Sequence, residues 1–175
     1  YLGGSGTEFI NAMAISPSDG TIYVTGNTSS TNFPTAVGAP QTALATADDG
    51  FVSQFNPALT VLLGSTYFGG DGDDTPRAIT VLGTSAVFVA GTTSSTNVPG
   101  TATGAQPTQP SAGNTHGFVA RFTPSLGTLT RASYIGGNAD STASGVVAHT
   151  NGVLVVGGTT ATNLISTGGA LQPAK

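Results

Sequence analysis

Three of the eight acidic side chains stand in one short, glycine-containing stretch, Gly70-Asp71-Gly72-Asp73-Asp74-Thr75. Carboxylate oxygens are the ligands that Ca²⁺ prefers. The spacing differs from that of an EF-hand loop, however, and no glutamate closes the stretch. Aspartates in turns also commonly accept hydrogen bonds from the local backbone. The stretch therefore predicts either a calcium site formed by Asp71, Asp73 and Asp74 or a solvated acidic turn.

A second acidic pair, Asp48 and Asp49, precedes an apolar run that starts at Gly50. Two adjacent carboxylates can share a proton or hold a cation. At the entry to a strand, an aspartate more commonly caps a turn. Both interpretations stay open for this pair.

Residues for nucleophilic catalysis are scarce. The chain has no cysteine, and its two histidines, His116 and His149, stand in different contexts. No Gly-x-Ser-x-Gly motif occurs, and neither histidine is flanked by a recognisable catalytic pattern. The Gly-rich stretch at 69–72 lacks the lysine and the following helix of a phosphate-binding loop. We therefore expect no catalytic residue, no enzyme, and no cofactor apart from the calcium alternative.

Composition sets the fold class and excludes several partners. Gly, Thr, Val and Phe are frequent, and long-chain helix formers are rare, so we expect an all-β chain. Four Lys and Arg against eight Asp and Glu leave no basic patch for nucleic acid. No apolar run reaches the roughly 20 residues of a membrane span. Because charged side chains are few, we expect a location outside the cell.

The elements that position these residues come from an internal repeat. A Tyr-x-Gly-Gly tetrad occurs at Tyr1, Tyr67 and Tyr134, at separations of 66 and 67 residues. Such a period indicates a repeat architecture. We predict one repeat array over residues 1–175, with blade 1 at 1–66, blade 2 at 67–133 and a partial blade 3 at 134–175.

Each full unit predicts four antiparallel strands. In blade 1, Asp19-Gly20 separates the two β-rich runs at 10–16 and 21–26, as expected for a hairpin turn. A third strand follows at 50–55 and a fourth at 59–68, which leads into the next tetrad. Four strands per unit without intervening helices are typical of a β-propeller blade. About two and a half blades are covered, so the ring is incomplete.

The long connections between the second and third strands recur as well. Thr28-Ser29-Ser30-Thr31-Asn32-Phe33-Pro34 in blade 1 corresponds to the run ending Val98-Pro99 in blade 2. A loop that every unit contains is more typical of a scaffold than of a single active site. We expect Phe33, Val98 and either Leu164 or Ile165 to act as apolar anchors.

These motifs, in this fixed order, resemble the bacterial SBBP family of seven-bladed β-propeller repeats. The resemblance rests on Tyr1-Leu2-Gly3-Gly4, Tyr23-Val24-Thr25-Gly26, the Phe33-Pro34 run, Gly38-Ala39-Pro40-Gln41 and Gly50-Phe51-Val52. It implies a secreted or surface-anchored bacterial protein that forms part of a larger chain. It implies no catalytic residue.

The sequence therefore leads to three functional hypotheses. The first is a non-enzymatic extracellular or cell-surface scaffold that binds protein or polysaccharide. The second is a structural subunit of a surface assembly or filament whose open blade edges are completed by neighbouring chains. The third is a carbohydrate-active enzyme with an axial pocket. We expect the rest of the propeller to come from the same longer chain or from neighbouring chains.

Overall fold

The structure, a computed structural model, describes residues 1–164 of the 175-residue chain. This part contains ten strands, one short 3₁₀ helix and no α-helix, which confirms the all-β prediction. The elements are β1 Glu8–Ile15, β2 Ile22–Thr28, β3 Asp49–Phe55, β4 Leu62–Phe68, β5 Asp74–Leu82, β6 Ala86–Thr93, η1 Thr101–Thr103, β7 His116–Phe122, β8 Leu129–Ile135, β9 Gly145–His149 and β10 Gly152–Val156.

The strands form three antiparallel groups that follow the repeat. The first sheet has the order β1-β2-β3-β4 and the second sheet β5-β6-β7-β8, while β9 and β10 form a hairpin. Each sheet is a meander, because every strand pairs with its successor in the chain. Gly20 stands in the β1–β2 turn with φ at 73°, a conformation that glycine adopts without strain. Open sheets of this kind are consistent with part of a propeller.

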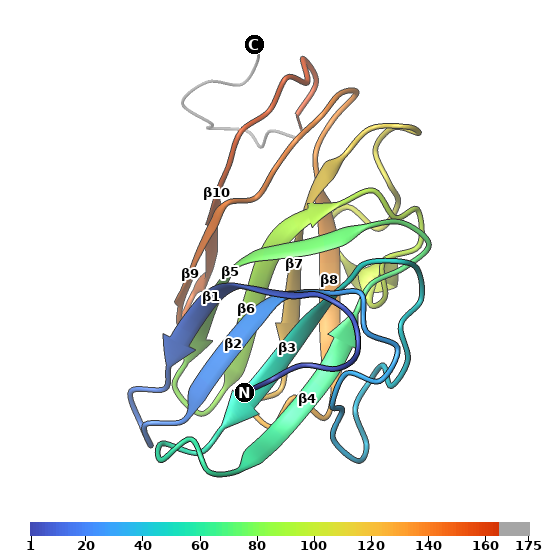
Figure 1. Cartoon of the computed structure of the whole chain (residues 1–175). Coiled ribbons are helices and arrows are strands. Elements are labelled where there is room, and N and C mark those ends of the chain that lie inside the picture. The colour runs from blue at the N-terminus through green and yellow to red at the C-terminus, as the bar shows by residue number, and fades with distance from the viewer. Residues whose placement is uncertain (165–175) are drawn as a thin grey trace.

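The two sheets and the hairpin are stacked side by side (Figure 1). Tyr23, Val52 and Phe68 of the first sheet share one buried cluster with many apolar residues of the second sheet. On the other face of the second sheet, Ala90 and Val146 pack together between that sheet and the hairpin. Each sheet therefore buries apolar side chains against the next, as expected for blades around a common core.

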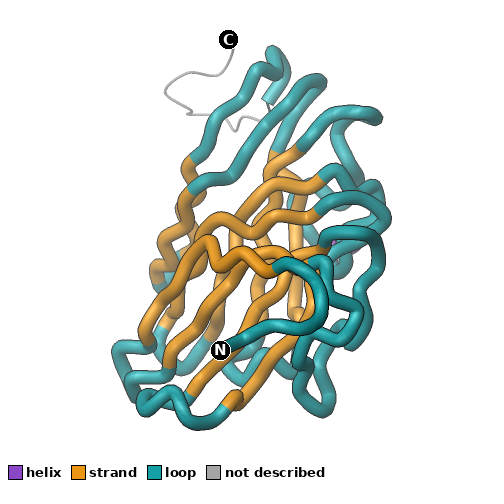
Figure 2. Tube along the Cα trace, viewed as in Figure 1, coloured by secondary structure: helices purple, strands orange, loops and turns teal. Residues whose placement is uncertain are grey.

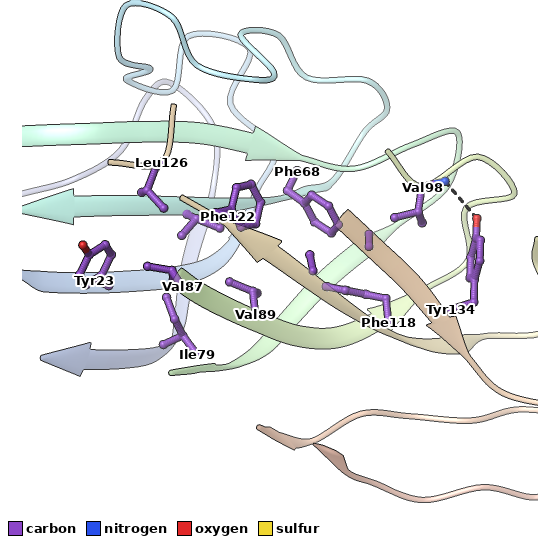
Figure 3. Packing of buried hydrophobic residues seen from close by; sticks show 13 residues of the cluster. Tyr23, Phe68, Ile79, Val87, Val89, Val98, Phe118, Phe122, Leu126 and Tyr134 are labelled. Atoms are coloured by element: carbon purple, nitrogen blue, oxygen red, sulfur yellow. Dashed lines mark hydrogen bonds between the residues drawn. The ribbon is translucent and has the colours of Figure 1, made fainter. Parts of the chain in front are cut away.

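Figure 3 shows the core between the two sheets. The ring of Phe68 lies 5.0 Å from that of Phe118 and 5.8 Å from that of Phe122, measured between centroids. Val87 and Val89 of β6 fill the space beside these rings and are fully buried. Burial of several large aromatic and aliphatic side chains is the main apolar contribution that holds the sheets together.

Several strand boundaries differ from the sequence prediction. The fourth strand of the first sheet begins at Leu62, three residues later than predicted, and that of the second sheet begins at the matching Leu129. Leu59 and Leu126 have φ values of 57° and 58°, which no strand residue adopts. In the first sheet, β1 begins at Glu8, two residues earlier than predicted. Asp74 starts β5 and so belongs to a strand rather than to the acidic turn.

The tyrosines of the second and third tetrads, Tyr67 in β4 and Tyr134 in β8, each fix the long connection of the sheet to which the strand belongs. The Tyr67 hydroxyl accepts a hydrogen bond from the Phe33 N–H at 2.9 Å and donates to the Ser30 carbonyl at 2.6 Å. Tyr134 likewise accepts from the Val98 N–H, the bond dashed in Figure 3, and donates to the Ser95 carbonyl. Both rings are buried. These bonds place the two long connections along the same side of the molecule (Figure 2).

The predicted anchors divide into three cases. Phe33 and Val98 are buried, Phe33 beside Phe51 and Tyr67, and Val98 within the core between the sheets. Leu164 is 42% exposed and so is not an anchor of the same kind. Ile165 lies outside the described residues, as does the rest of the partial blade 3 to residue 175. No helix among residues 1–164 has the length and apolar character to cross a membrane.

Candidate functional site

The acidic stretch at 70–75 is a junction between the sheets in which each aspartate has a separate task. The carboxylate of Asp71 is exposed and accepts hydrogen bonds from both the backbone N–H and the hydroxyl of Thr96. The Asp71 N–H in turn donates to Asn97 Oδ1 at 2.8 Å. These bonds to Thr96 stabilise the charged form and hold the pKa of Asp71 below its usual value. The result is a clamp between the tetrad turn and the loop after β6.

The third unit builds the same clamp without a charge. Asn138, which matches Asp71, accepts a hydrogen bond from the Thr162 N–H at 3.0 Å, and its own N–H donates to Asn163 Oδ1 at 2.7 Å. Since a neutral side chain makes the same contacts, the clamp does not depend on a bound cation. Asp73 is exposed and holds Ser94 through its backbone: its N–H donates to Ser94 Oγ at 2.9 Å.

No three His, Cys, Asp or Glu side chains gather as a metal-binding group within residues 1–164. Asp71 and Asp74 direct their carboxylates to different partners, Thr96 and Ser95. The calcium site of Asp71, Asp73 and Asp74 stays a prediction, and the hydrogen bonds favour the alternative of a structural turn.

A fully buried pair of carboxylates lies where the two sheets meet. Asp49 begins β3 and Asp74 begins β5. A Cβ placed on Gly69 would lie 2.7 Å from Asp49 Oδ1 and 2.9 Å from Asp74 Oδ2. The two carboxylates therefore flank a single point of the tetrad turn, and only glycine fits there.

The hydrogen bonds of this pair are unequal. Asp49 accepts from the Ala45 N–H at 2.5 Å and from the Thr46 hydroxyl at 3.0 Å. In Asp74, Oδ2 accepts from Ser95 Oγ at 2.6 Å and from the Gly70 N–H at 2.8 Å, while buried Oδ1 has no partner. A buried, incompletely bonded carboxylate disfavours its charged form.

Burial dominates the titration of both groups. Burial raises the pKa of Asp74 to about 6, and the neighbouring Asp49 charge adds to this effect, against the hydrogen bonds from Ser95 and Gly70. Burial also raises the pKa of Asp49, although the Ala45 and Thr46 bonds oppose it. The sequence hypothesis of a shared proton paired Asp49 with its neighbour Asp48. The structure instead brings Asp49 to Asp74, from the next repeat.

The two histidines lie in different environments. His116 occupies in β7 the position that Asp49 has in β3, and it is fully buried. Its Nε2 lies 2.9 Å from the Ser111 carbonyl, while its Nδ1 has no partner. His149 is exposed at the β9–β10 turn. The structure does not bring the two together, so they form no catalytic pair.

One face of the first sheet points away from the second sheet and is not covered by any other described strand; it is here called the open face. Its exposed apolar side chains are Ile10, Met13, Ile15, Leu59 and Leu63. The matching positions of the second sheet include Ile79, which is 8% exposed, and Leu126, which is 1% exposed. Met13 and Leu59, their counterparts, are 59% and 63% exposed.

Sequence reasoning missed the open face and the Asp49–Asp74 pair. One signal was available for the open face, because the two repeats align position by position and both carry apolar residues on the same side of each strand. Nothing local pairs Asp49 with Asp74, since they belong to different repeats.

Comparison with known protein families agrees with the repeat analysis. Residues 1–34 match the SBBP family, which is described as a beta-propeller repeat. This match confirms the SBBP resemblance on the first tetrad, the β1–β2 hairpin and the run that ends at Pro34. No curated protein matches the chain.

Proposed function

We propose that this protein, which carries a β-propeller repeat of the SBBP family, is a non-enzymatic scaffold at the cell surface or outside the cell. It binds another protein through the open face. The observation that carries this proposal is the exposure of Met13 and Leu59 at positions whose counterparts are buried between the sheets. Several large apolar side chains exposed on one face of a sheet are typical of a protein interaction site.

The chemistry of the open face favours a protein over a polysaccharide. Its side chains are aliphatic, and the hydroxyl and amide groups of the unit are largely used within the loops. The packing of the first sheet on the matching face of the second sheet supports a partner that presents the apolar side of a β-sheet. Association then gains its free energy from apolar area that is removed from water.

The extracellular location is supported by composition. The sequence has a single lysine and only twelve charged side chains in 175 residues. Loop surfaces rich in Ser, Thr, Asn and Gly carry the polar contacts instead, as in the clamps around Asn32 and Asn97.

The buried carboxylate pair does not favour an enzyme. Asp49 and Asp74 are fully buried beneath the tetrad turn, so no substrate reaches them in this conformation. A catalytic carboxylate must contact the reacting atoms. Turnover of a glycan by the full chain that is lost in Asp49→Asn would revive the hypothesis of a carbohydrate-active enzyme.

Retention on two immobilised fractions tests the proposal. One fraction contains the surface proteins of the source cells, and the other contains their surface polysaccharide after protease treatment. The full chain, Ile15→Asp and the control Leu154→Asp are applied to each fraction. Leu154 is 65% exposed on β10, away from the open face. We expect retention on the protein fraction to fall at least about tenfold for Ile15→Asp alone.

Two outcomes would overturn the proposal. Equal retention of Ile15→Asp and the control would exclude the open face. Retention on the polysaccharide that survives protease treatment and depends on Ile15 would identify a glycan ligand instead.

A further inference from the structure

A second surface, on the opposite side of the second sheet from the first sheet, carries two of the three arginines of the described residues. It is a groove of about 410 Å³ between the second sheet and the β9–β10 turn. Its walls include Phe88, Arg121, Arg131, His149 and Val153, and none of the residues between 1 and 164 that line it is Asp or Glu. The groove thus combines an apolar floor with cationic walls.

The two arginines stand directly opposite each other. Arg121 of β7 and Arg131 of β8 are cross-strand partners, and both are exposed. The Arg121 guanidinium lies 5.8 Å from the centroid of the Phe88 ring. Like charges placed directly opposite on neighbouring strands are destabilising unless an anion lies between them. Guanidinium groups bind carboxylates through paired, charge-assisted hydrogen bonds.

The repeat supplies a template for what occupies this position. Gln54 and Gly64 of the first sheet are cross-strand partners in the register of the two arginines. Over them lies the β7–β8 turn of the second unit, residues 123–126. The Tyr23 hydroxyl donates to the Pro124 carbonyl at 2.8 Å, and a Cβ on Gly64 would lie 2.7 Å from the Ser125 oxygen. At the junction of the sheets, the position is filled by a polypeptide turn.

The groove cannot accept that turn unchanged. Arg131 replaces Gly64, so its side chain occupies the space that the Ser125 carbonyl requires at the other junction. Arg121 replaces the neutral Gln54, and Phe88 replaces Tyr23 and removes the hydroxyl donor. The occupant must therefore be a turn that leaves room for Arg131 and supplies negative charge.

We propose that the groove binds a polypeptide turn bearing a carboxylate side chain, held between Arg121 and Arg131. The apolar part of the turn packs on Phe88 and Val153, as Leu126 packs at the junction of the two sheets. The carboxylate takes the place of the Ser125 carbonyl and accepts hydrogen bonds from the two guanidinium groups. This surface is separate from the open face and does not depend on it.

Fluorescence anisotropy with two labelled peptides tests this proposal on the full chain. One peptide has the sequence of residues 122–130, and the other carries Ser125→Asp in that sequence. The protein variants are Arg121→Gln/Arg131→Gly, which restores the residues of the first sheet, and the control Arg77→Gln. We expect the acidic peptide to bind the natural chain and the control at least about tenfold more tightly than the neutral peptide. The double variant loses this preference, and added salt reduces it.

Equal binding of the two peptides, or a preference that survives in the double variant, would overturn the proposal. So would tighter binding of oligogalacturonate than of the acidic peptide, because it would identify an acidic glycan as the ligand. If the double variant does not fold, NMR of the arginine Nε–H signals in the natural chain decides. The acidic peptide then shifts Arg121 and Arg131 but leaves Arg77 unchanged, and the absence of such shifts contradicts the proposal.

Discussion

The same blade face occurs twice in this molecule in two different states. On the second sheet it is covered by the first sheet, and Leu126 is 1% exposed. On the first sheet it is open, and the matching Leu59 is 63% exposed although its backbone has the same unusual φ. The β3–β4 turn therefore has the backbone conformation of the β7–β8 turn although no neighbouring sheet packs on Leu59. Each repeat therefore presents the same apolar face, whether or not another sheet covers it.

Burial also reverses the titration of equivalent carboxylates. Glu8 in β1 matches Asp74 in β5, and both accept hydrogen bonds from the serine of the following loop and from the tetrad glycine. For Glu8, desolvation is outweighed by the Ser30 and Thr28 hydroxyls, and its pKa is lowered. For Asp74, burial at the junction prevails and the pKa is raised to about 6.

Truncation of the matched leucines gives the largest expected difference. Leu126→Ala removes a fully buried side chain and should lower the free energy of unfolding by about 2–5 kcal/mol. Leu59→Ala should change it by no more than about 0.5 kcal/mol, because an exposed side chain loses little contact. The positive φ is common to both positions, so it cancels in the comparison. Urea titration of both variants measures the difference, and equal losses would contradict the assigned packing.

Asp74→Asn tests the difference in titration between Asp74 and Glu8 through the pH dependence of stability. Because the folded pKa is raised, protonated Asp74 contributes stability that is complete below the unfolded pKa near 3.8 and is lost as pH rises through about 6. The cost of the charge at neutral pH is on the order of 2–3 kcal/mol. The variant should therefore be more stable than the natural chain at pH 7, with a smaller gap at pH 4.

Glu8→Gln is the matched control for this pH effect. The lowered pKa of Glu8 gives the opposite sign, with stability present above its unfolded pKa and lost as pH falls through the folded value. Thermal melts from about pH 2 to pH 7 measure both slopes, because the effect of Glu8 falls below its unfolded pKa of 4.5 and that of Asp74 falls above 3.8. A natural chain whose stability relative to Asp74→Asn is independent of pH would contradict the buried pair.

Tyr134→Phe tests the hydroxyl clamp of the loop. The Val98 N–H is buried and loses its acceptor, which should cost about 1–3 kcal/mol. Tyr67→Phe, which leaves the Phe33 N–H without an acceptor, should cost a similar amount, since each clamp joins a strand to the long connection of the same sheet. Chemical denaturation of the two variants measures the free energy of unfolding that each loses. A large difference between them would show that the clamp depends on the neighbouring sheet.

Asp71→Asn should give the smallest change. Asn138 already makes the same clamp in the third unit, so the melting temperature is expected to stay within about one degree, in calcium or in EDTA. Differential scanning calorimetry measures this. A fall in the melting temperature on adding EDTA, abolished by Asp71→Asn, would instead establish the calcium site of Asp71, Asp73 and Asp74.

Local patterns predicted the strands but not the contacts between repeats. The Asp19-Gly20 turn and the tetrads give the hairpins and the four-strand units, because turn chemistry acts over a few residues. The meeting of Asp49 with Asp74 depends on how one sheet stacks on the next. The late start of β4 follows from the φ of Leu59, and no propensity predicts a left-handed leucine. The groove around Arg121 likewise joins strands with a distant turn.

The oxidation rate of Met13 tests most directly whether the open face is an interaction surface. Met13 is the only methionine of the chain, lies on β1 and is 59% exposed, so hydrogen peroxide reports on this face alone. The full chain is mixed with the surface proteins of the source cells. We expect Met13 to be oxidised several-fold more slowly in this mixture than in urea. In the Ile15→Asp variant, we expect Met13 in the same mixture to be oxidised as fast as in urea. Oxidation of Met13 in the natural chain at the unfolded rate in that mixture would contradict a covered face and, with it, the proposed function.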